Sequence, residues 1–168
     1  MGTPSRIVRP VDSNSALRPI LEDFATKYDV AARLRFDPVE LPRRYAQPDD
    51  VEVAGLIAAS LAYGRAQVFK PCAARILDRM GARPGQFARD YSCEPDVRVF
   101  EGLSYRFNKS SDIAALVAAI GWMSTAHGML GRRFGTLFQS GNLRSALVRF
   151  GEELRGAPWC SPLKNRTT

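Results

Sequence analysis

Two long segments without a charged side chain constrain the fold of this chain most strongly. Residues 53–63 and 113–123 are each 11 residues long and almost entirely apolar. Each is too short to span a bilayer, and each has the length and composition of a buried helix. Because the chain shows no convincing two-residue alternation of a half-buried strand, we predict an all-α fold of seven to eight helices.

Other helices are predicted from spacing and capping residues. An apolar stripe at helical spacing marks a first amphipathic helix; its members are Leu17, Ile20, Leu21, Phe24 and Tyr28. A helix near 66–80 is expected to bend or break at Pro71. Shorter helices are expected after Pro84, around 96–100 and through Phe134 and Phe138. Asn142 is expected to cap a last helix with one apolar face, formed by Leu143, Ala146, Leu147, Phe150 and Leu154.

These elements predict one helical domain over residues 15–157. A flexible tail is expected over 1–14 and an irregular tail over 158–168. Three prolines in the stretch 35–50 predict an extended connection there. One domain of this length is long enough to bury a sizeable core.

The charge distribution allows two interpretations. The formal net charge is +7, and residues 101–168 carry nine basic against four acidic side chains, a surplus of five. Such a surplus points to a polyanion partner such as nucleic acid. Only four of the 24 basic residues are lysine, however, and an arginine-heavy composition is also typical of a GC-rich genome.

The sequence predicts no metal or cofactor site. Three scattered cysteines and one histidine, His127, fit neither a disulfide framework nor a zinc site. His127 is expected to be structural, and no motif of nucleophilic, nucleotide-binding or metal-dependent catalysis is present. Since no secretory signal or membrane-spanning segment is found, we predict a cytoplasmic protein. The oligomeric state stays open.

Three acidic residues precede the first buried segment. Asp49, Asp50 and Glu52 form a cluster that could hold a metal, but carboxylates at a helix N-terminus also cap its N–H groups. We predict the capping role, with Asp49 or Asp50 as the cap. Ser110 or Ser111 is expected to cap the second buried helix in the same way.

Two short stretches combine aromatic and basic residues. The first buried segment is followed by Gly64 and Arg65 directly after Tyr63. The loop 104–112 contains, in order, Tyr105, Arg106, Phe107, Asn108 and Lys109. Cations at a helix N-terminus can meet a phosphate. In the alternative interpretation, Tyr63 packs and Arg65 is solvated. Tyr105 and Phe107 then anchor their loop in the core, while Arg106 caps or pairs. The arginine pair at 132–133 is expected to lie on a solvated face.

The segments "DPVELPRRY", "DVEVAGLIAASLAYGR" and "YRF" resemble a bacterial family, domain of unknown function 2400. The resemblance extends from about Leu17 to about Lys164. The family in turn resembles helix-hairpin-helix DNA glycosylases, in which a turn after a buried helix fills the gap left by a flipped-out base. The resemblance implies double-stranded DNA as partner. The residues expected to contact it are Tyr63, Gly64, Arg65, Gln67, Tyr105, Arg106 and Lys164.

The same resemblance implies an incomplete site. Family members are longer and contain a Pro-Leu-Asp-Thr-His segment, similar to the glycosylase segment with the catalytic aspartate. This chain has no counterpart, so it is expected to be truncated and no catalytic residue is carried over. Two functions remain open: a DNA-binding protein related to base-excision glycosylases but without the catalytic half, and a helical protein-interaction module.

Overall fold

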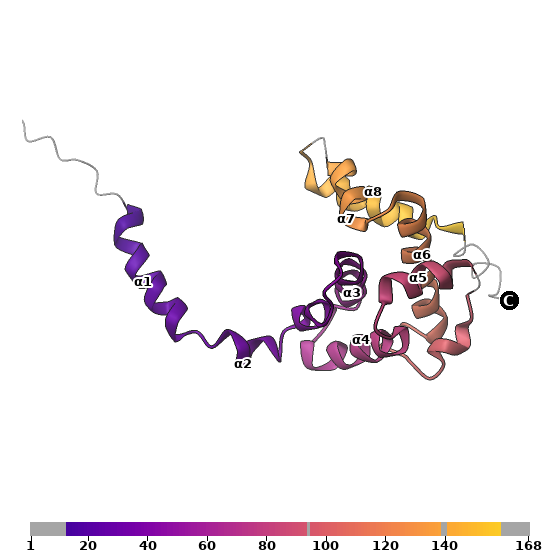
Figure 1. The fold of residues 1–168 in the computed structure, drawn as a ribbon, viewed down its shortest axis with the longest axis horizontal. Coiled ribbons are helices and arrows are strands. Elements are labelled where there is room, and N and C mark those ends of the chain that lie inside the picture. Colours follow the sequence, from indigo (N-terminus) through magenta and orange to yellow (C-terminus); the bar gives the residue numbers. More distant parts are fainter. Residues whose placement is uncertain (1–12, 94, 139–140, 159–168) are drawn as a thin grey trace, which may run out of the picture. The chain divides into compact units, whose positions relative to one another are not determined.

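A computed structural model describes residues 13–93, 95–138 and 141–158. The chain divides into two compact units, Met1–Arg35 and Phe36–Thr168. Within the described residues there are eight α-helices, three short 3-10 helices and no strand (Figure 1). The predicted all-α fold is confirmed.

The first unit contains the predicted amphipathic helix. Helix α1 spans Ser13–Lys27 and α2 spans Val30–Leu34. The Asp29 carboxylate accepts a hydrogen bond from the Ala32 amide at 2.9 Å and caps α2. Pro19 lies inside α1, beyond its first turn, and the helix continues through it. The predicted stripe of five apolar side chains lies on this helix and at the residue just after it.

The second unit holds the remaining helices. In chain order they are η1 Pro38–Glu40, η2 Pro42–Arg44, α3 Pro48–Ser60, α4 Ala66–Met80, α5 Pro84–Cys93, η3 Val97–Phe100, α6 Ser110–His127, α7 Leu130–Leu137 and α8 Leu143–Arg155. The stretch 35–50 is therefore not extended. Its prolines each open a helical element, because the first helical position needs no N–H. Pro71 likewise does not break α4, which is continuous.

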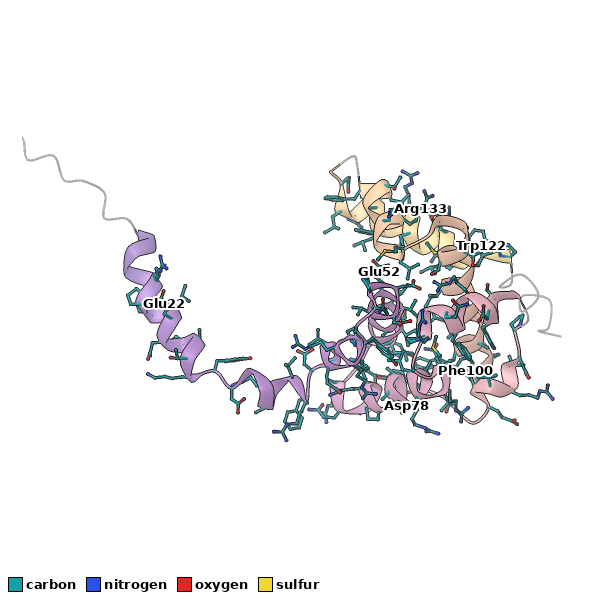
Figure 2. The ribbon with its side chains drawn as sticks, viewed as in Figure 1. Glu22, Glu52, Asp78, Phe100, Trp122 and Arg133 are labelled. Atoms are coloured by element: carbon teal, nitrogen blue, oxygen red, sulfur yellow. The ribbon has the colours of Figure 1, made fainter. Side chains whose placement is uncertain are left out.

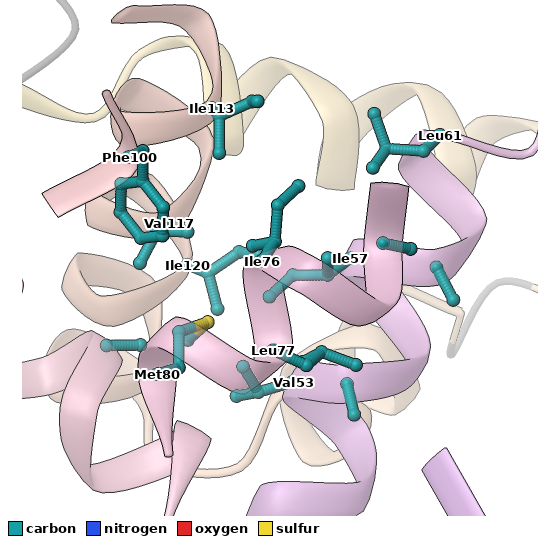
Figure 3. Packing of buried hydrophobic residues seen from close by; sticks show 14 of the residues in the cluster. Val53, Ile57, Leu61, Ile76, Leu77, Met80, Phe100, Ile113, Val117 and Ile120 are labelled. Carbon is teal, nitrogen blue, oxygen red and sulfur yellow. The ribbon is translucent and has the colours of Figure 1, made fainter. Parts of the chain in front are cut away.

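The core forms where α3, α4 and α6 meet. These helices direct fully buried aliphatic side chains toward one another (Figure 3). From α3 come Val53 and Ile57, from α4 Ile76 and Leu77, and from α6 Ile113, Val117 and Ile120. The two uncharged segments of the sequence are thus central helices, as predicted, because neither has a polar face to offer to water.

Helices α5 and α6 pack backbone against backbone. A Cβ atom on Gly121 would overlap the main-chain carbonyl of Ala88. The aromatic rings of Phe87, Tyr91 and Phe100 fill the space beside this contact, with centroids 5.5–6.2 Å apart. Burial, with the nearby Asp96 carboxylate, raises the pKa of Tyr91 to about 12. Its hydroxyl therefore stays protonated and donates to the Asp96 carbonyl at 2.9 Å.

The acidic residues of α3 cap another helix. The N-cap of α3 is Gln47, so the predicted capping of α3 by Asp49 or Asp50 is wrong. The buried Asp50 carboxylate instead accepts a hydrogen bond from the Gly85 amide at 2.8 Å, in the first turn of α5. Asp49 pairs with Arg89 of α5, and Glu52 accepts from the Gly131 amide at the start of α7. These carboxylates thus join α3 to α5 and α7. Figure 2 labels Glu52 on α3.

Capping of α6 also differs from the prediction. The N-cap is Lys109, whose amide donates to the Asp112 carboxylate at 2.7 Å. Ser110 uses its hydroxyl elsewhere, donating to the Leu103 carbonyl at 3.0 Å. Asn142 caps α8 as predicted, accepting from the Ser145 amide at 3.0 Å.

The apolar face of α8 is only partly buried. Ala146 is fully buried, and Phe150 and Leu154 pack against the core. Leu143 and Leu147 were expected on the same buried face, but they are 56% and 55% exposed. Arg133 of α7 makes two hydrogen bonds to the Glu153 carboxylate of α8 and ties the two helices together. These hydrogen bonds hold the pKa of Glu153 below its ordinary value.

The described part of the chain contains no single helix that is long and apolar enough to cross a membrane. The pair α6 and α7 reaches that length and composition together, across a 71° bend. Much of α6 is buried in the core described above.

Candidate functional site

The first element of the site is the turn between α3 and α4. After Ser60 the chain turns sharply, and the Tyr63 amide donates to the Leu61 carbonyl at 2.7 Å. Gly64 has φ +97°, a left-handed conformation that residues with a Cβ atom rarely adopt. This conformation leads the chain into Arg65, the N-cap of α4, whose side chain is exposed. The Arg65 side chain makes no capping hydrogen bond to the first turn of α4.

The second element is a tight hairpin before α6. Tyr105 and Asn108 form an antiparallel bridge, each amide donating to the other residue's carbonyl at 2.9 Å. Arg106 and Phe107 occupy its tip. Arg106 has φ +53° and is the one residue other than glycine with a positive φ among those described. A non-glycine residue in this region costs on the order of 1–3 kcal/mol, so the surrounding contacts must hold it there.

The two elements are joined by reciprocal hydrogen bonds. The Tyr63 hydroxyl donates to the Tyr105 carbonyl at 3.2 Å, and the Tyr105 hydroxyl donates to the Tyr63 carbonyl. The Asn108 side-chain amide donates to the Tyr63 hydroxyl at 2.7 Å. The two tyrosine rings lie 4.9 Å apart, tilted by 53°. We call residues 62–67 and 104–109 together the paired-loop surface.

Gly64 and Arg106 meet across this junction. The Arg106 guanidinium lies over the Tyr63 ring, 5.9 Å from its centroid. A Cβ atom on Gly64 would come within 2.8 Å of Arg106 Nη1 and 3.0 Å of the Tyr105 hydroxyl. Gly64 is therefore favoured for its backbone conformation, and its lack of a Cβ atom leaves the space that the guanidinium occupies.

The paired-loop surface is positively charged. Arg65, Arg106 and Lys109 are exposed, and neither loop contains a carboxylate. The nearest acidic residue that follows, Asp112, is used in the cap of α6. Three cations therefore stand beside half-buried and exposed aromatic rings without a neutralising partner in either loop, an arrangement suited to binding an anion.

The structure brings six of the seven predicted contact residues together. Tyr63, Gly64 and Arg65 lie on the first loop, Gln67 lies in the first turn of α4 that follows it, and Tyr105 and Arg106 lie on the second loop. The seventh, Lys164, lies outside the described residues. Of the two aromatic anchors expected in the second loop, Tyr105 is buried. Phe107 is not: its side chain is 84% exposed.

Two residues of the second loop were recognised as part of its aromatic and basic stretch but were not among the expected DNA contacts. Asn108 connects the loops through Tyr63, and Lys109 adds a cation beside Arg106. Both belong to the aromatic and basic stretch already recognised, so its composition was the available signal. Their roles depend on a contact between two loops that lie 42–45 residues apart in the sequence. No pattern in the sequence predicts that contact.

The other polar candidates have structural roles. His127 is the last residue of α6. Its ring packs edge to face with the Trp122 ring, and the two ring centroids are 6.2 Å apart. The described residues contain no group of three or more histidine, cysteine, aspartate or glutamate side chains that could hold a metal ion. Cys72 is a half-buried thiol whose Sγ lies 3.8 Å from the Ser104 carbonyl, and burial raises its pKa. A neutral thiol is a poor nucleophile.

Comparison with known proteins identifies one family. The family model described as "Protein of unknown function (DUF2400)" matches residues 37–167, which is most of the chain. The match includes the whole paired-loop surface. No curated protein and no solved structure matches the chain.

Proposed function

We propose that this chain, which belongs to the DUF2400 family of proteins of unknown function, binds double-stranded DNA through the paired-loop surface. The observation that carries the proposal is the junction itself. Tyr63 and Tyr105 hold two cationic loops together, although those loops lie far apart in the sequence. Electrostatic attraction to phosphates supplies most of the affinity of proteins that bind DNA without sequence preference.

Each loop offers a different contact to the DNA backbone. Arg65 stands at the uncapped N-terminus of α4, where the first N–H groups and the helix dipole favour an anion. Arg106 is oriented by the hairpin and by the Tyr63 ring, so little side-chain freedom is lost when it meets a phosphate. Lys109 extends the same positive surface toward α6. Together they supply up to three phosphate contacts.

The resemblance to helix-hairpin-helix glycosylases supports the choice of DNA over other polyanions. In those enzymes the turn that corresponds to Tyr63, Gly64 and Arg65 faces the DNA. Our proposal is for DNA binding in a glycosylase-like context, and it assigns no catalytic residue to this chain.

The test is a titration of duplex DNA with the wild-type protein and with R65A and R106A. The wild type should bind at low salt and weaken steeply between about 50 and 200 mM salt. Each substitution should lower the affinity and reduce the slope of log K against log salt concentration by about one. Circular dichroism should show unchanged helical content, since both side chains are exposed.

The matched control is R132A, which removes one exposed arginine from α7. It changes the net charge by the same amount outside the paired-loop surface. If R132A and R65A lost the same amount of DNA affinity, the protein would be attracted to DNA by its net charge alone. That result would refute the assigned site. Unchanged affinity in both R65A and R106A would refute it as well.

A second function has one observation in its favour. Helix α8 exposes Leu143, Leu147 and Val148, each by more than half. Exposed aliphatic side chains on one helix are typical of a surface that contacts another protein. This alternative, a helical protein-interaction module, predicts no DNA binding even at low salt. It also predicts that L147E, and not R65A, abolishes the protein's association with its partner.

A further inference from the structure

Phe107 is the most exposed large hydrophobic side chain among the described residues, at 84%. Burial of such a ring would stabilise the fold, and this ring contributes almost none of that stabilisation. The two residues that form the bridge at the base of the tip are less exposed: Tyr105 is buried and Asn108 is half-buried. The ring thus projects from a loop whose base is anchored in the protein.

The hairpin holds this ring in a defined position. The bridge between Tyr105 and Asn108 closes the turn directly on either side of the tip. The Ser110 hydroxyl binds the Leu103 carbonyl at 3.0 Å and fixes the base of the loop. The left-handed backbone of Arg106 then sets the direction of the tip. A rigid aromatic side chain loses little conformational entropy when it contacts a partner.

The surroundings of Phe107 indicate the kind of partner. Arg106 precedes it, Lys109 follows two residues later, and Arg65 lies on the facing loop. An apolar ring set among cations fits a nucleic acid, because each base offers an apolar π-face with phosphates on both sides. An apolar pocket of a protein would leave the adjacent cations without partners unless it had an acidic rim.

We propose that Phe107 stacks on a base at an interruption of the duplex, so that the protein binds interrupted DNA more tightly than continuous DNA. This inference rests on the proposed function. Within a continuous duplex, a side chain can reach a base face only after neighbouring bases unstack, and this unstacking is unfavourable. At a one-nucleotide gap this unstacking has already occurred. Stacking on an aromatic side chain then adds about five- to a hundredfold in affinity.

The experiment compares two probes of the same sequence, a continuous duplex and a duplex with a one-nucleotide gap. Wild-type protein should prefer the gapped probe by at least about fivefold. F107A should lose that preference and bind the continuous duplex as the wild type does, and F107W should restore it. F36A is the matched control, because Phe36 is 69% exposed outside the paired-loop surface; it should leave the preference unchanged.

The outcomes separate this inference from the proposed function. Salt-dependent binding without preference for the gap in the wild type overturns the role of Phe107 and leaves the DNA surface in place. The role of Phe107 is also overturned if F107A still prefers the gapped probe, or if F107A loses the same factor in affinity for both probes. Binding of neither probe by the wild type, even at low salt, refutes the proposed function together with the inference.

Discussion

Tyr63 and Tyr105 each donate a hydroxyl hydrogen bond to the other's main-chain carbonyl. The pair joins the end of α3 to the hairpin before α6 across 42 residues of sequence. Both rings also pack against the core from this position. One pair of side chains thus connects the central helices to the paired-loop surface and fixes the spacing of its cations.

Removal of one hydroxyl from this pair should loosen the junction. Y105F retains the buried ring but loses the hydrogen bond to the Tyr63 carbonyl. We expect a loss of about 1 kcal/mol in the free energy of unfolding, measured by urea denaturation. Y91F is the comparison, since its hydroxyl also binds a carbonyl but lies outside the surface. Both variants should lose stability, whereas only Y105F should lose DNA affinity. Equal DNA affinity in the two would contradict the role of the junction.

Gly64 should tolerate no side chain. G64A combines an unfavourable left-handed backbone with a Cβ atom that displaces the Arg106 guanidinium. We expect a loss of about 1–2 kcal/mol in stability from the backbone alone, and a further loss from the close contacts. G102A separates these effects. Gly102 has φ +74° and no atom within 4 Å of a Cβ position. Should G64A prove no more destabilising than G102A in thermal denaturation, the close packing of Arg106 is not significant.

The close contact between α5 and α6 should not tolerate a side chain at Gly121 without a loss of stability. In G121A the new methyl group would meet the Ala88 carbonyl, and the backbone of two helices must separate to accept it. We expect a loss of about 1–3 kcal/mol or more in the free energy of unfolding. G151A, at an open position on α8, should instead gain up to about 1 kcal/mol from helix propensity. The same sign of effect in the two variants would argue against this packing.

Asp50 should stabilise the start of α5 from a neighbouring helix. D50A removes the acceptor of the Gly85 N–H bond and leaves that amide without its partner. By analogy with loss of an N-cap, we expect about 0.5–2 kcal/mol of destabilisation in urea. D50N retains an acceptor oxygen and should lose less. The charge of Asp50 would be the dominant factor if the two variants were equally destabilised.

The stabilising effect of the Arg133–Glu153 pair should depend on pH. The hydrogen bonds from Arg133 lower the folded-state pKa of Glu153, so the folded state holds the proton less tightly than the unfolded state. This contribution to stability is therefore present above the unfolded pKa of about 4.3 and is lost as the pH falls through the lower folded pKa. The difference in unfolding free energy between wild type and E153Q should be present at neutral pH and shrink under acid. A difference that does not change with pH would contradict this origin.

Most helices were predictable from the sequence because they are determined by local features, namely apolar segments and capping residues. The uncharged segments became α3 and α6, and Asn142 caps α8. The errors arose where tertiary contacts override local rules. Asp50 lies at the N-terminus of α3, yet it binds the amide of Gly85 in another helix. Leu143 and Leu147 have the spacing of an apolar face, but both are more than half exposed, whereas Ala146 between them is fully buried.

The candidate site was predictable in residue type but not in arrangement. The aromatic and basic composition of both loops is visible in the sequence. Their junction through Tyr63 and Tyr105 depends on how α3 and α6 pack. The exposure of Phe107 depends on the left-handed backbone of Arg106, a conformation for which arginine has no intrinsic preference.

Amide hydrogen exchange of the protein with and without a short DNA duplex, at low salt, tests the central claim most directly. DNA binding at the paired-loop surface predicts slower exchange over residues 62–68 and 104–110, with little change in α8. Slower exchange confined to α7 and α8, or no change at a concentration where the duplex is bound, would contradict it.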